Sequence, residues 1–264
     1  MRLTRIIAGI SFALISTSIA FAGQTKCPEH FAGGQAPDLI NQKLSAKTRE
    51  VCYAGFGLLH SGITRTPLYS AEHLTRDRLT QAKGLKRSSK FFPDPNIPKA
   101  ERAELRHYAR SGYDRGHVAP SADMPDESSQ QECFSLANMV PQVPENNRGI
   151  WEGVESAVRK LTTTRGELFV VTGPIFMGDN LQRIGGAVMV PTKLYKAVYD
   201  PNRQEAGAYL VDNTADTQAQ IMSITDLEKL TGISLFPSVS EKVKNKAMRL
   251  PEPKTYKERR KRGR

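Results

Sequence analysis

The chain has 264 residues, of which 39% are hydrophobic and 25% are charged. This length and composition are typical of a soluble globular protein with one sizeable core, and they exclude a fibrous or low-complexity chain. The formal net charge is +11, and residues 241–264 supply +8 of it, with eleven Lys and Arg against three Glu. A nucleic-acid partner therefore has to be inferred from local groups of residues rather than from a global basic field.

The first 22 residues have the features of a secretory signal peptide. A positively charged start precedes an apolar run over residues 6–21, and Ala20 and Ala22 are small residues at the two positions that a signal peptidase reads. A membrane anchor is the weaker alternative, because the run is short for crossing a bilayer. We therefore expect cleavage after Ala22 and a periplasmic or secreted mature protein without a membrane span.

Export to an oxidising compartment makes the three cysteines informative. Cys27 and Cys52 flank the first segment of the mature chain, and a bridge between them would tie that arm to the first strand. Cys133 would then remain as a buried thiol in a short helix. We predict the Cys27–Cys52 pairing, although the sequence leaves the other connectivities open.

The predicted elements follow from hydrophobic periodicity and turn residues. The predicted helices cover residues 38–47, 99–110, 128–133 and 147–161, and a last helix is opened by a capping box at residues 225–228 and ended by Gly232. The predicted strands cover residues 51–60, 68–75, 115–119, 134–140, 168–172, 187–190, 194–199, 207–211 and 220–224. Together they predict a single α+β domain over residues 23–240, with a mostly antiparallel central sheet flanked by helices.

Residues 241–264 form a basic and polar C-terminal tail. This composition favours a mobile segment that attracts polyanions over long range. The alternative is that the tail docks on the domain through its apolar residues, which are Val243, Met248, Leu250 and Tyr256.

Asp114, Arg115, Gly116 and His117 place four functional groups in successive positions. The imidazole can take a proton from water near neutral pH, and the guanidinium can form a forked contact with a phosphate. Glycine lets the backbone approach a ligand or turn sharply, and the carboxylate can hold a neighbouring side chain. Each group answers a need of phosphodiester cleavage, although a polar turn beside a strand would explain the tetrapeptide equally well.

A second group of polar residues follows at helical spacing. Asn147, Trp151 and Glu155 are four residues apart, so one face of a helix would carry an amide, an indole and a carboxylate. A buried helix face would more often carry Leu or Ile at these positions. Amide and carboxylate oxygens suit a hard cation such as Mg²⁺, which keeps most of its waters.

In combination, these motifs resemble the DNA/RNA non-specific endonuclease family. The motifs are Asp-Arg-Gly-His at 114–117, Asn-Met-Val-Pro-Gln at 138–142, and Asn147 with Trp151 and Glu155. Weaker likeness at residues 65–75, 171–176 and 190–196 extends the resemblance over roughly residues 50–236. That family includes secreted bacterial sugar-non-specific nucleases and mitochondrial endonuclease G, and it has a ββα-metal active site. The resemblance implies Mg²⁺ as the cofactor, with Mn²⁺ as a substitute.

The resemblance and the chemistry of the side chains assign the central roles. His117 is the expected general base, because a neutral imidazole can accept a proton at physiological pH. Asn147 is the expected metal ligand through its amide oxygen, which leaves most of the coordination shell to water and phosphate. The family pattern implies that Glu155 holds a metal-bound water.

Two arginines are expected to bind the phosphate. Arg115 comes from the motif itself, and Arg87 is implied by the family pattern because Lys86 and Arg87 precede an Asp-Pro pair. The spacing there differs from the family, so Lys83 or Lys90 are alternatives. Asn138 is expected to orient His117 or the substrate.

The remaining residues are expected to support the site. Asp114 is expected to order the motif strand, Gly116 to allow close approach, and Trp151 to pack against the sheet rather than stack on bases. His73 is expected to be structural. A basic segment is expected to line a phosphate track, with a solvated loop as the alternative: Arg76, Arg78, Lys83, Lys86, Arg87 and Lys90.

The leading interpretation is an exported Mg²⁺-dependent endonuclease that hydrolyses DNA and RNA with little sugar or sequence preference, because phosphate contacts carry no base information. One alternative is a non-catalytic nucleic-acid-binding envelope protein, which would not need a general base. Another is a phosphodiesterase that acts on a different substrate, such as a lipid head group. The oligomeric state is left open, with a homodimer among the alternatives.

Overall fold

The structure is a computed structural model that describes residues 24–87, 90–255 and 258. The expected signal peptide, at residues 1–22, lies outside the described residues. Within the described part of the chain, no helix is both long enough and apolar enough to cross a bilayer.

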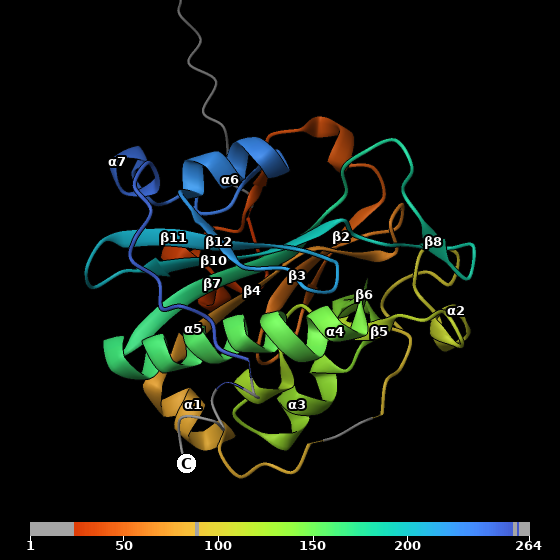
Figure 1. The fold of residues 1–264 in the computed structure, drawn as a ribbon, viewed down its shortest axis with the longest axis horizontal. Coiled ribbons are helices and arrows are strands. Elements are labelled where there is room, and N and C mark those ends of the chain that lie inside the picture. The colour runs from red at the N-terminus through yellow and green to blue at the C-terminus, as the bar shows by residue number, and fades with distance from the viewer. Residues whose placement is uncertain (1–23, 88–89, 256–257, 259–264) are drawn as a thin grey trace, which may run out of the picture.

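A seven-stranded antiparallel sheet forms the centre of the molecule (Figure 1). Its order is β12-β11-β10-β7-β4-β3-β2, so β7 pairs with two strands that are distant in sequence. The bounds are β2 (Thr48–Cys52), β3 (Gly57–Ser61), β4 (Thr66–Thr75), β7 (Glu167–Ile175), β10 (Lys193–Asp200), β11 (Glu205–Asp212) and β12 (Gln220–Met222). The predicted α+β class with an antiparallel sheet is confirmed.

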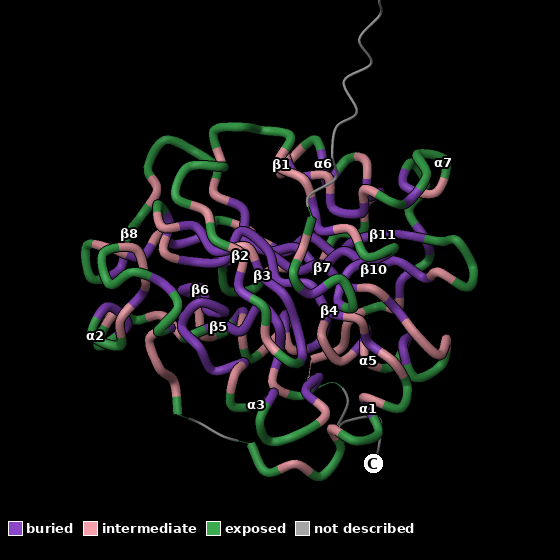
Figure 2. The backbone as a smooth tube through the Cα atoms, turned by 180° about the vertical axis from the view of Figure 1, so that it is seen from behind, coloured by how far each residue is buried: buried purple, intermediate pink, exposed green. Residues whose placement is uncertain are grey.

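Helices cover both faces of this sheet, which leaves its central strands buried in the middle (Figures 1 and 2). One face packs on α5 (Glu152–Arg165), and α1 (Arg76–Ala82) and α3 (Glu127–Cys133) lie on the same side. The other face packs on the N-terminal arm and α6 (Ile224–Thr231). Because both faces are covered, strands such as β10 are buried along almost their whole length and do not alternate with polar residues.

The helix α5 has its apolar residues on one side. Val154, Val158 and Leu161 recur at intervals of four and three residues, so they form a stripe that packs on the sheet. The helix ends at Gly166, whose φ of 102° is unfavourable for residues with a side chain. The sheet face under α5 and the inner side of α5 thus form one hydrophobic core.

Four predicted elements are wrong in detail. Of the strand predicted at 134–140, only the last two residues lie in a strand, β6 (Met139–Gln142), because the 3₁₀ turn η5 (Leu136–Asn138) precedes it. The helix predicted at 38–47 is instead the short strand β1 (Asp38–Leu39), which pairs with β13 (Ile233–Ser234), followed by the 3₁₀ turn η3 (Gln42–Leu44). The single strand predicted at 51–60 is instead the hairpin of β2 and β3. Its turn contains Tyr53 and Phe56, whose rings stack with their centroids 4.5 Å apart. Of the helix predicted at 99–110, only α2 (Leu105–Tyr108) forms.

The predicted last helix forms as α6, but its cap differs from the prediction. The Ser223 hydroxyl accepts a hydrogen bond from the Asp226 amide, so Ser223 rather than Thr225 is the N-cap. Gly232 ends the helix as predicted, with a φ of 69°.

The C-terminal segment packs on the domain, so the mobile tail expected there is wrong for residues 241–255. The short helix α7 (Glu241–Lys244) is followed by Met248 and Leu250, each only 5% exposed. The docking alternative describes these residues better, because apolar side chains within the basic stretch find a place in the core under α5. The end of the segment, including Tyr256, lies outside the described residues apart from Glu258.

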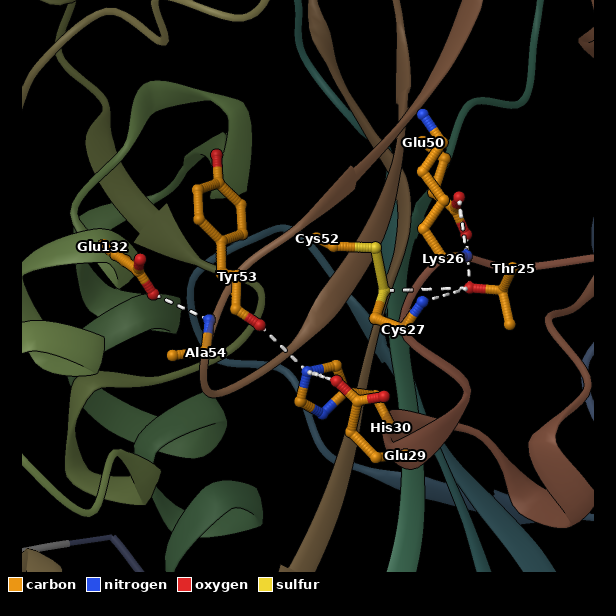
Figure 3. Close-up of a disulfide and its surroundings, with 10 residues drawn as sticks. All are labelled: Thr25, Lys26, Cys27, Glu29, His30, Glu50, Cys52, Tyr53, Ala54 and Glu132. Atoms are coloured by element: carbon orange, nitrogen blue, oxygen red, sulfur yellow. Dashed lines mark hydrogen bonds and ion pairs between the residues drawn. A yellow bond between two sulfur atoms is a disulfide. The ribbon is translucent and has the colours of Figure 1, made fainter.

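The predicted disulfide between Cys27 and Cys52 is present (Figure 3). Their Cα atoms are 5.9 Å apart, and the bond ties the N-terminal arm to the end of β2. Beside it, the Nε2 atom of His30 lies 2.9 Å from the Tyr53 carbonyl oxygen (Figure 3). Cys133 is a buried free thiol as expected, and burial raises its pKa.

Candidate active site

Two short strands bring the sequence motifs together. The Asp-Arg-Gly-His motif is β5 (Asp114–His117), and it pairs antiparallel with β6 (Met139–Gln142). Gly116 lies against the Gln142 side chain, since a Cβ atom at 116 would be only 2.1 Å from Oε1 of Gln142. Glycine at 116 therefore leaves room for the Gln142 side chain.

Gln142 also connects this hairpin to the segment that carries Asn147. Its side-chain nitrogen donates to Oδ1 of Asn146 at 2.8 Å, and the Asn146 amide donates to the carbonyl oxygens of Asp212 and Thr214. These bonds fix α4 (Pro144–Asn146) between β6 and the end of β11. The next residue, Asn147, begins the π-helical turn η6 (Asn147–Trp151), which leads into α5.

Asn147 is oriented by a carboxylate of the motif strand. Its side-chain nitrogen donates to Oδ2 of Asp114 at 3.0 Å, so its amide oxygen is left for another partner. Arg148 binds the same carboxylate through Nε at 2.8 Å and Nη2 at 2.6 Å. Partial burial works to raise the pKa of Asp114, but the hydrogen bonds from Arg148 and Asn147 outweigh it and hold the pKa below its usual value. Asp114 thus remains ionised, and its partner is Arg148 rather than the adjacent Arg115.

His117 lies in an aromatic setting at the end of β5. Its ring is edge-on to Phe134, with centroids 4.7 Å apart, and 5.7 Å from Phe91. The residue is 8% exposed, and its Nε2 atom is buried without a hydrogen-bond partner. Burial, together with the charge of Arg87, lowers the pKa of His117 to about 3. The imidazole is therefore neutral near pH 7 and able to accept a proton.

The two predicted phosphate-binding arginines lie over the same two rings. The guanidinium carbon of Arg115 lies 4.2 Å from the Phe91 centroid, and that of Arg87 lies 5.7 Å from the Phe134 centroid. Both distances are in the range of a cation–π contact. The structure thus brings both arginines to His117, and Arg87 is the cation whose charge acts on the His117 pKa.

Asn138 is fully buried and bonded to the backbone around the motif. Its amide nitrogen donates to the carbonyl oxygens of Ala119 and Cys133, and its oxygen accepts from the Ala119 amide and the Ser70 hydroxyl. These bonds use its donors and acceptor on the protein itself. Asn138 therefore acts on His117 through the chain two residues beyond it, and not by pointing at the ring or at a substrate.

Glu155 lies on the inner side of α5, one turn from an arginine that the sequence analysis missed. Nη1 of Arg159 is 4.0 Å from a Glu155 oxygen and 3.0 Å from a carboxylate oxygen of Asp123, which is 2% exposed. Burial raises the pKa of Glu155 to about 7, against the charges of Arg159 and Lys196 that lower it. The spacing of four residues between Glu155 and Arg159 is the signal that could have revealed this pair.

Two buried ionisable residues under α5 were also missed. Glu72 on β4 is 0% exposed and Lys196 on β10 is 1% exposed. Lys196 donates to the Thr172 hydroxyl at 2.7 Å, and a Glu72 oxygen accepts from Arg78 at 3.5 Å. Burial raises the pKa of Glu72 above its usual value, and Asp123 adds to that effect. No local pattern predicts this group, because its members come from distant strands.

Trp151 and His73 have structural positions, as expected. Trp151 is 1% exposed in the core under α5, and the Lys196 ammonium lies 5.8 Å from its ring centroid. His73 stacks on Phe169 at 4.3 Å and bonds to Glu167 at 2.9 Å.

The basic segment divides into structural and exposed members. Arg76 donates to the Thr163 carbonyl oxygen, and Arg78 donates to those of Asp123 and His73. These two arginines tie α1 to its neighbours and do not form part of an open phosphate track, which corrects that expectation. Lys83, Lys86, Arg87 and Lys90 are on or near the surface.

One group of cysteine and carboxylate atoms in the described chain has metal-like proximity, formed by Cys27, Glu50 and Cys52. The disulfide occupies both of its sulfur atoms, so this group is not a metal site. Asn147, whose side-chain nitrogen is bonded to Asp114, and the Glu155 carboxylate on the helix that follows stay the predicted metal-site residues.

Comparison with known proteins agrees with this geometry. The model of the DNA/RNA non-specific endonuclease family matches residues 35–242. The mitochondrial nuclease EXOG of Danio rerio is 35% identical over 212 residues, which cover 72% of this chain but only 61% of that protein. Nuclease C1 of Cunninghamella echinulata var. echinulata is 35% identical over 192 residues, which cover 65% of this chain and 76% of that one.

A solved structure extends the likeness to the fold. The crystal structure of the EndoG/EndoGI complex contains a chain that superimposes with a TM-score of 0.69 at 28% identity, covering 74% of this chain and 88% of the other. The matched family region contains β5, β6, η6 and α5, which carry the motifs described above. This chain therefore belongs to the DNA/RNA non-specific endonuclease family.

Proposed function

We propose that the protein is an exported, metal-dependent endonuclease that hydrolyses the phosphodiester bonds of DNA and RNA with little sugar or sequence preference. One observation carries this proposal: a single strand, β5, holds both a buried, neutral imidazole with an unpartnered Nε2 and the carboxylate that orients Asn147. A binding protein would not need a proton acceptor there. Family membership supports nucleic acid as the substrate.

In this proposal His117 accepts the proton of the attacking water. The low pKa keeps the ring neutral, and Phe91 and Phe134 hold it in one orientation. Because a substrate phosphate would bring negative charge next to the ring, its binding would raise the pKa of His117 and strengthen it as a base.

Arg115 and Arg87 bind and neutralise the phosphate. Both lie on the aromatic rings beside His117, and both are exposed. A guanidinium can donate two hydrogen bonds to phosphate oxygens, which fixes the phosphorus atom relative to the base. Contacts of this kind read the backbone rather than the base, which supports the low sequence preference.

Asn147 holds the metal, with Mg²⁺ as the proposed ion and Mn²⁺ as a substitute. The fit is good because the Asp114 carboxylate receives the amide hydrogen and turns the neutral oxygen outward, and a hard divalent cation prefers oxygen ligands. When bound, the ion supplies charge stabilisation for the transition state and the leaving oxygen. Glu155 is proposed to hold one of its waters.

The exported location is part of the proposal. It rests on the charged start, apolar run and small residues of residues 1–22. The disulfide supports an oxidising compartment. The EXOG relatives are named as mitochondrial nucleases, and that name describes the location of those proteins rather than of this chain.

A nicking assay on supercoiled plasmid, run beside a structured RNA, tests the function. We expect cleavage of both substrates with Mg²⁺ or Mn²⁺ and none in excess EDTA. His117→Ala should bind DNA normally but turn over on the order of 100-fold or more slowly, the scale of a positioned base. Full activity in EDTA would exclude the metal, and near-normal turnover of His117→Ala would exclude this base.

A further inference from the structure

We propose that residues 247–255, here called the C-terminal strap, clamp the start of α5 and thereby steady η6 and position Asn147; this inference rests on the function proposed above. The family match ends at residue 242, so the strap follows the matched region. In Figure 1 the chain that descends from α7 crosses in front of α5.

The first part of the strap is built into the edge of the sheet. Ala247 forms a parallel bridge with Ala206, and the Met248 amide donates to the Ala206 carbonyl oxygen at 2.7 Å. The approach is close, since a Cβ atom at Gly207 would be 3.0 Å from Cγ of Met248. Met248 and Leu250 then enter the core that contains Trp151, the last residue of η6.

The middle of the strap lies directly on the first turn of α5. The Tyr209 hydroxyl on β11 donates to the Pro251 carbonyl oxygen at 2.5 Å. A Cβ atom at Gly153 would be 3.0 Å from the Lys254 carbonyl oxygen and 3.1 Å from its carbonyl carbon. Glycine at 153 thus lets the strap backbone rest on the helix two residues beyond Trp151.

The last part of the strap faces η6 across a cavity of about 750 Å³. Glu252, Pro253 and Thr255 line one side of it, and Arg148, Gly149 and Ile150 line the other. Thr255 is held in turn, because its amide and hydroxyl donate to Glu258 at 2.7 and 2.8 Å. The strap and η6 therefore line one pocket, and the close backbone contact of the strap is on Gly153, at the start of α5.

The turn η6 needs such support because its own geometry is irregular. It has π-helical hydrogen bonding, which is uncommon, and Gly149 inside it has non-helical angles of φ −113° and ψ −105°. Glycine in the middle of a helix also lowers the cost of leaving the observed conformation. Met248 and Leu250 share the core with Trp151, and the strap rests on the start of α5 directly after η6, so loss of the strap would let Asn147 move relative to Asp114.

Two truncations separate this clamp from the charge of the tail. A chain that ends at Glu258 lacks residues 259–264 but keeps the strap together with the Glu258 that holds Thr255, and a chain that ends at Leu250 keeps the core residues but loses most of the strap. The measurements are turnover at saturating plasmid, the Mg²⁺ concentration for half-maximal rate, and the melting temperature.

We expect the chain that ends at Glu258 to keep the turnover and Mg²⁺ requirement of the full chain. The chain that ends at Leu250 should lose on the order of tenfold to a hundredfold in turnover and need more Mg²⁺, because a displacement of about 1 Å at a catalytic group has effects of this size. Equal turnover and Mg²⁺ requirement in the two truncated chains would overturn the clamp. Inactivity of the full chain would instead overturn the proposed function.

A point variant keeps the test decisive if the shorter chain does not fold. Gly153→Val places a side chain against the Lys254 backbone and pushes the strap away while the whole sequence after 153 stays present. Gly153→Val should raise the Mg²⁺ requirement, as we expect of the truncation at Leu250. A folded Gly153→Val protein with an unchanged Mg²⁺ requirement and turnover would overturn the proposal.

Discussion

The imidazole of His117 stands edge-on to the ring of Phe134, with the centroids 4.7 Å apart and an interplanar angle of 86°. Phe134 is 0% exposed, so this contact fixes the base against a rigid part of the core. The Phe91 ring also packs on Phe134, with the centroids 4.9 Å apart. The Arg115 guanidinium lies over the Phe91 ring. The proposed base, His117, and the proposed phosphate-binding arginines therefore share one aromatic support.

Replacing Phe91 by Leu should weaken phosphate binding more than chemistry. The change removes the ring under Arg115, a contact worth about 0.5 to 1 kcal/mol at an exposed site, while Phe134 still holds His117. We expect KM for DNA to rise by a small factor with little change in kcat. The neighbouring variant Phe92→Leu is the control, and an equal change in both variants would contradict the role of the Arg115–Phe91 contact.

Removing the acceptor of Asn147 should raise the metal requirement. In Asp114→Asn the charged acceptor for Asn147 is lost, so the amide oxygen is less well oriented and the Mg²⁺ concentration for half-maximal rate should rise. Asn147→Ala should abolish metal-dependent cleavage or raise the requirement further. Arg148→Ala leaves the Asp114–Asn147 bond in place and should have the smaller effect; a larger effect than Asp114→Asn would argue against this orientation.

The pKa of His117 should be far below that of an ordinary histidine. The pKa of His117 is about 3 in the folded protein and about 6.5 in the unfolded chain. The unfolded state therefore binds more protons than the folded state between these pH values. The free energy of unfolding should therefore decrease as the pH falls from about 6.5 toward 3, by up to about 1.4 kcal/mol per pH unit from this group. NMR titration of the imidazole in the free protein measures it, and a midpoint near 6.5 would contradict the buried, neutral ring.

A variant without the His117 imidazole tests how this group affects the pH dependence of stability. His117→Asn removes the ionisable ring, so its free energy of unfolding should depend less steeply on pH over this range than that of the unchanged protein. Chemical denaturation at several pH values compares the two, and identical slopes would show that His117 contributes nothing to the acid sensitivity.

The disulfide should stabilise the fold without taking part in the chemistry. Cys52→Ser frees the N-terminal arm from β2, and we expect a loss of roughly 2 to 4 kcal/mol in the free energy of unfolding with kcat nearly unchanged. Cys133→Ser is the matched control for thiol chemistry, since Cys133 is free and buried. A large loss of kcat in a folded Cys52→Ser protein would mean that the arm shapes the site.

The sequence by itself carried the family motifs and predicted the antiparallel α+β class, the Cys27–Cys52 bridge among other open pairings, and the approximate places of most strands from β4 to β12, but not β8 or the start of β6. These features depend on local periodicity, short motifs and a small number of cysteines. It misplaced the hairpin of β2 and β3, because an apolar turn with Tyr53 and Phe56 continues the apolar pattern of the strands.

Only the tertiary structure decided which side chains meet. Asp114 and Arg148 are 34 residues apart in sequence and form an ion pair, while Glu72 on β4 and Lys196 on β10 are both buried under α5 although β7 lies between their strands. The C-terminal strap is the clearest case. Its composition is that of a solvated basic tail, but two buried side chains and a few backbone contacts are enough to hold it on α5, and such contacts depend on the shape of the surface they meet.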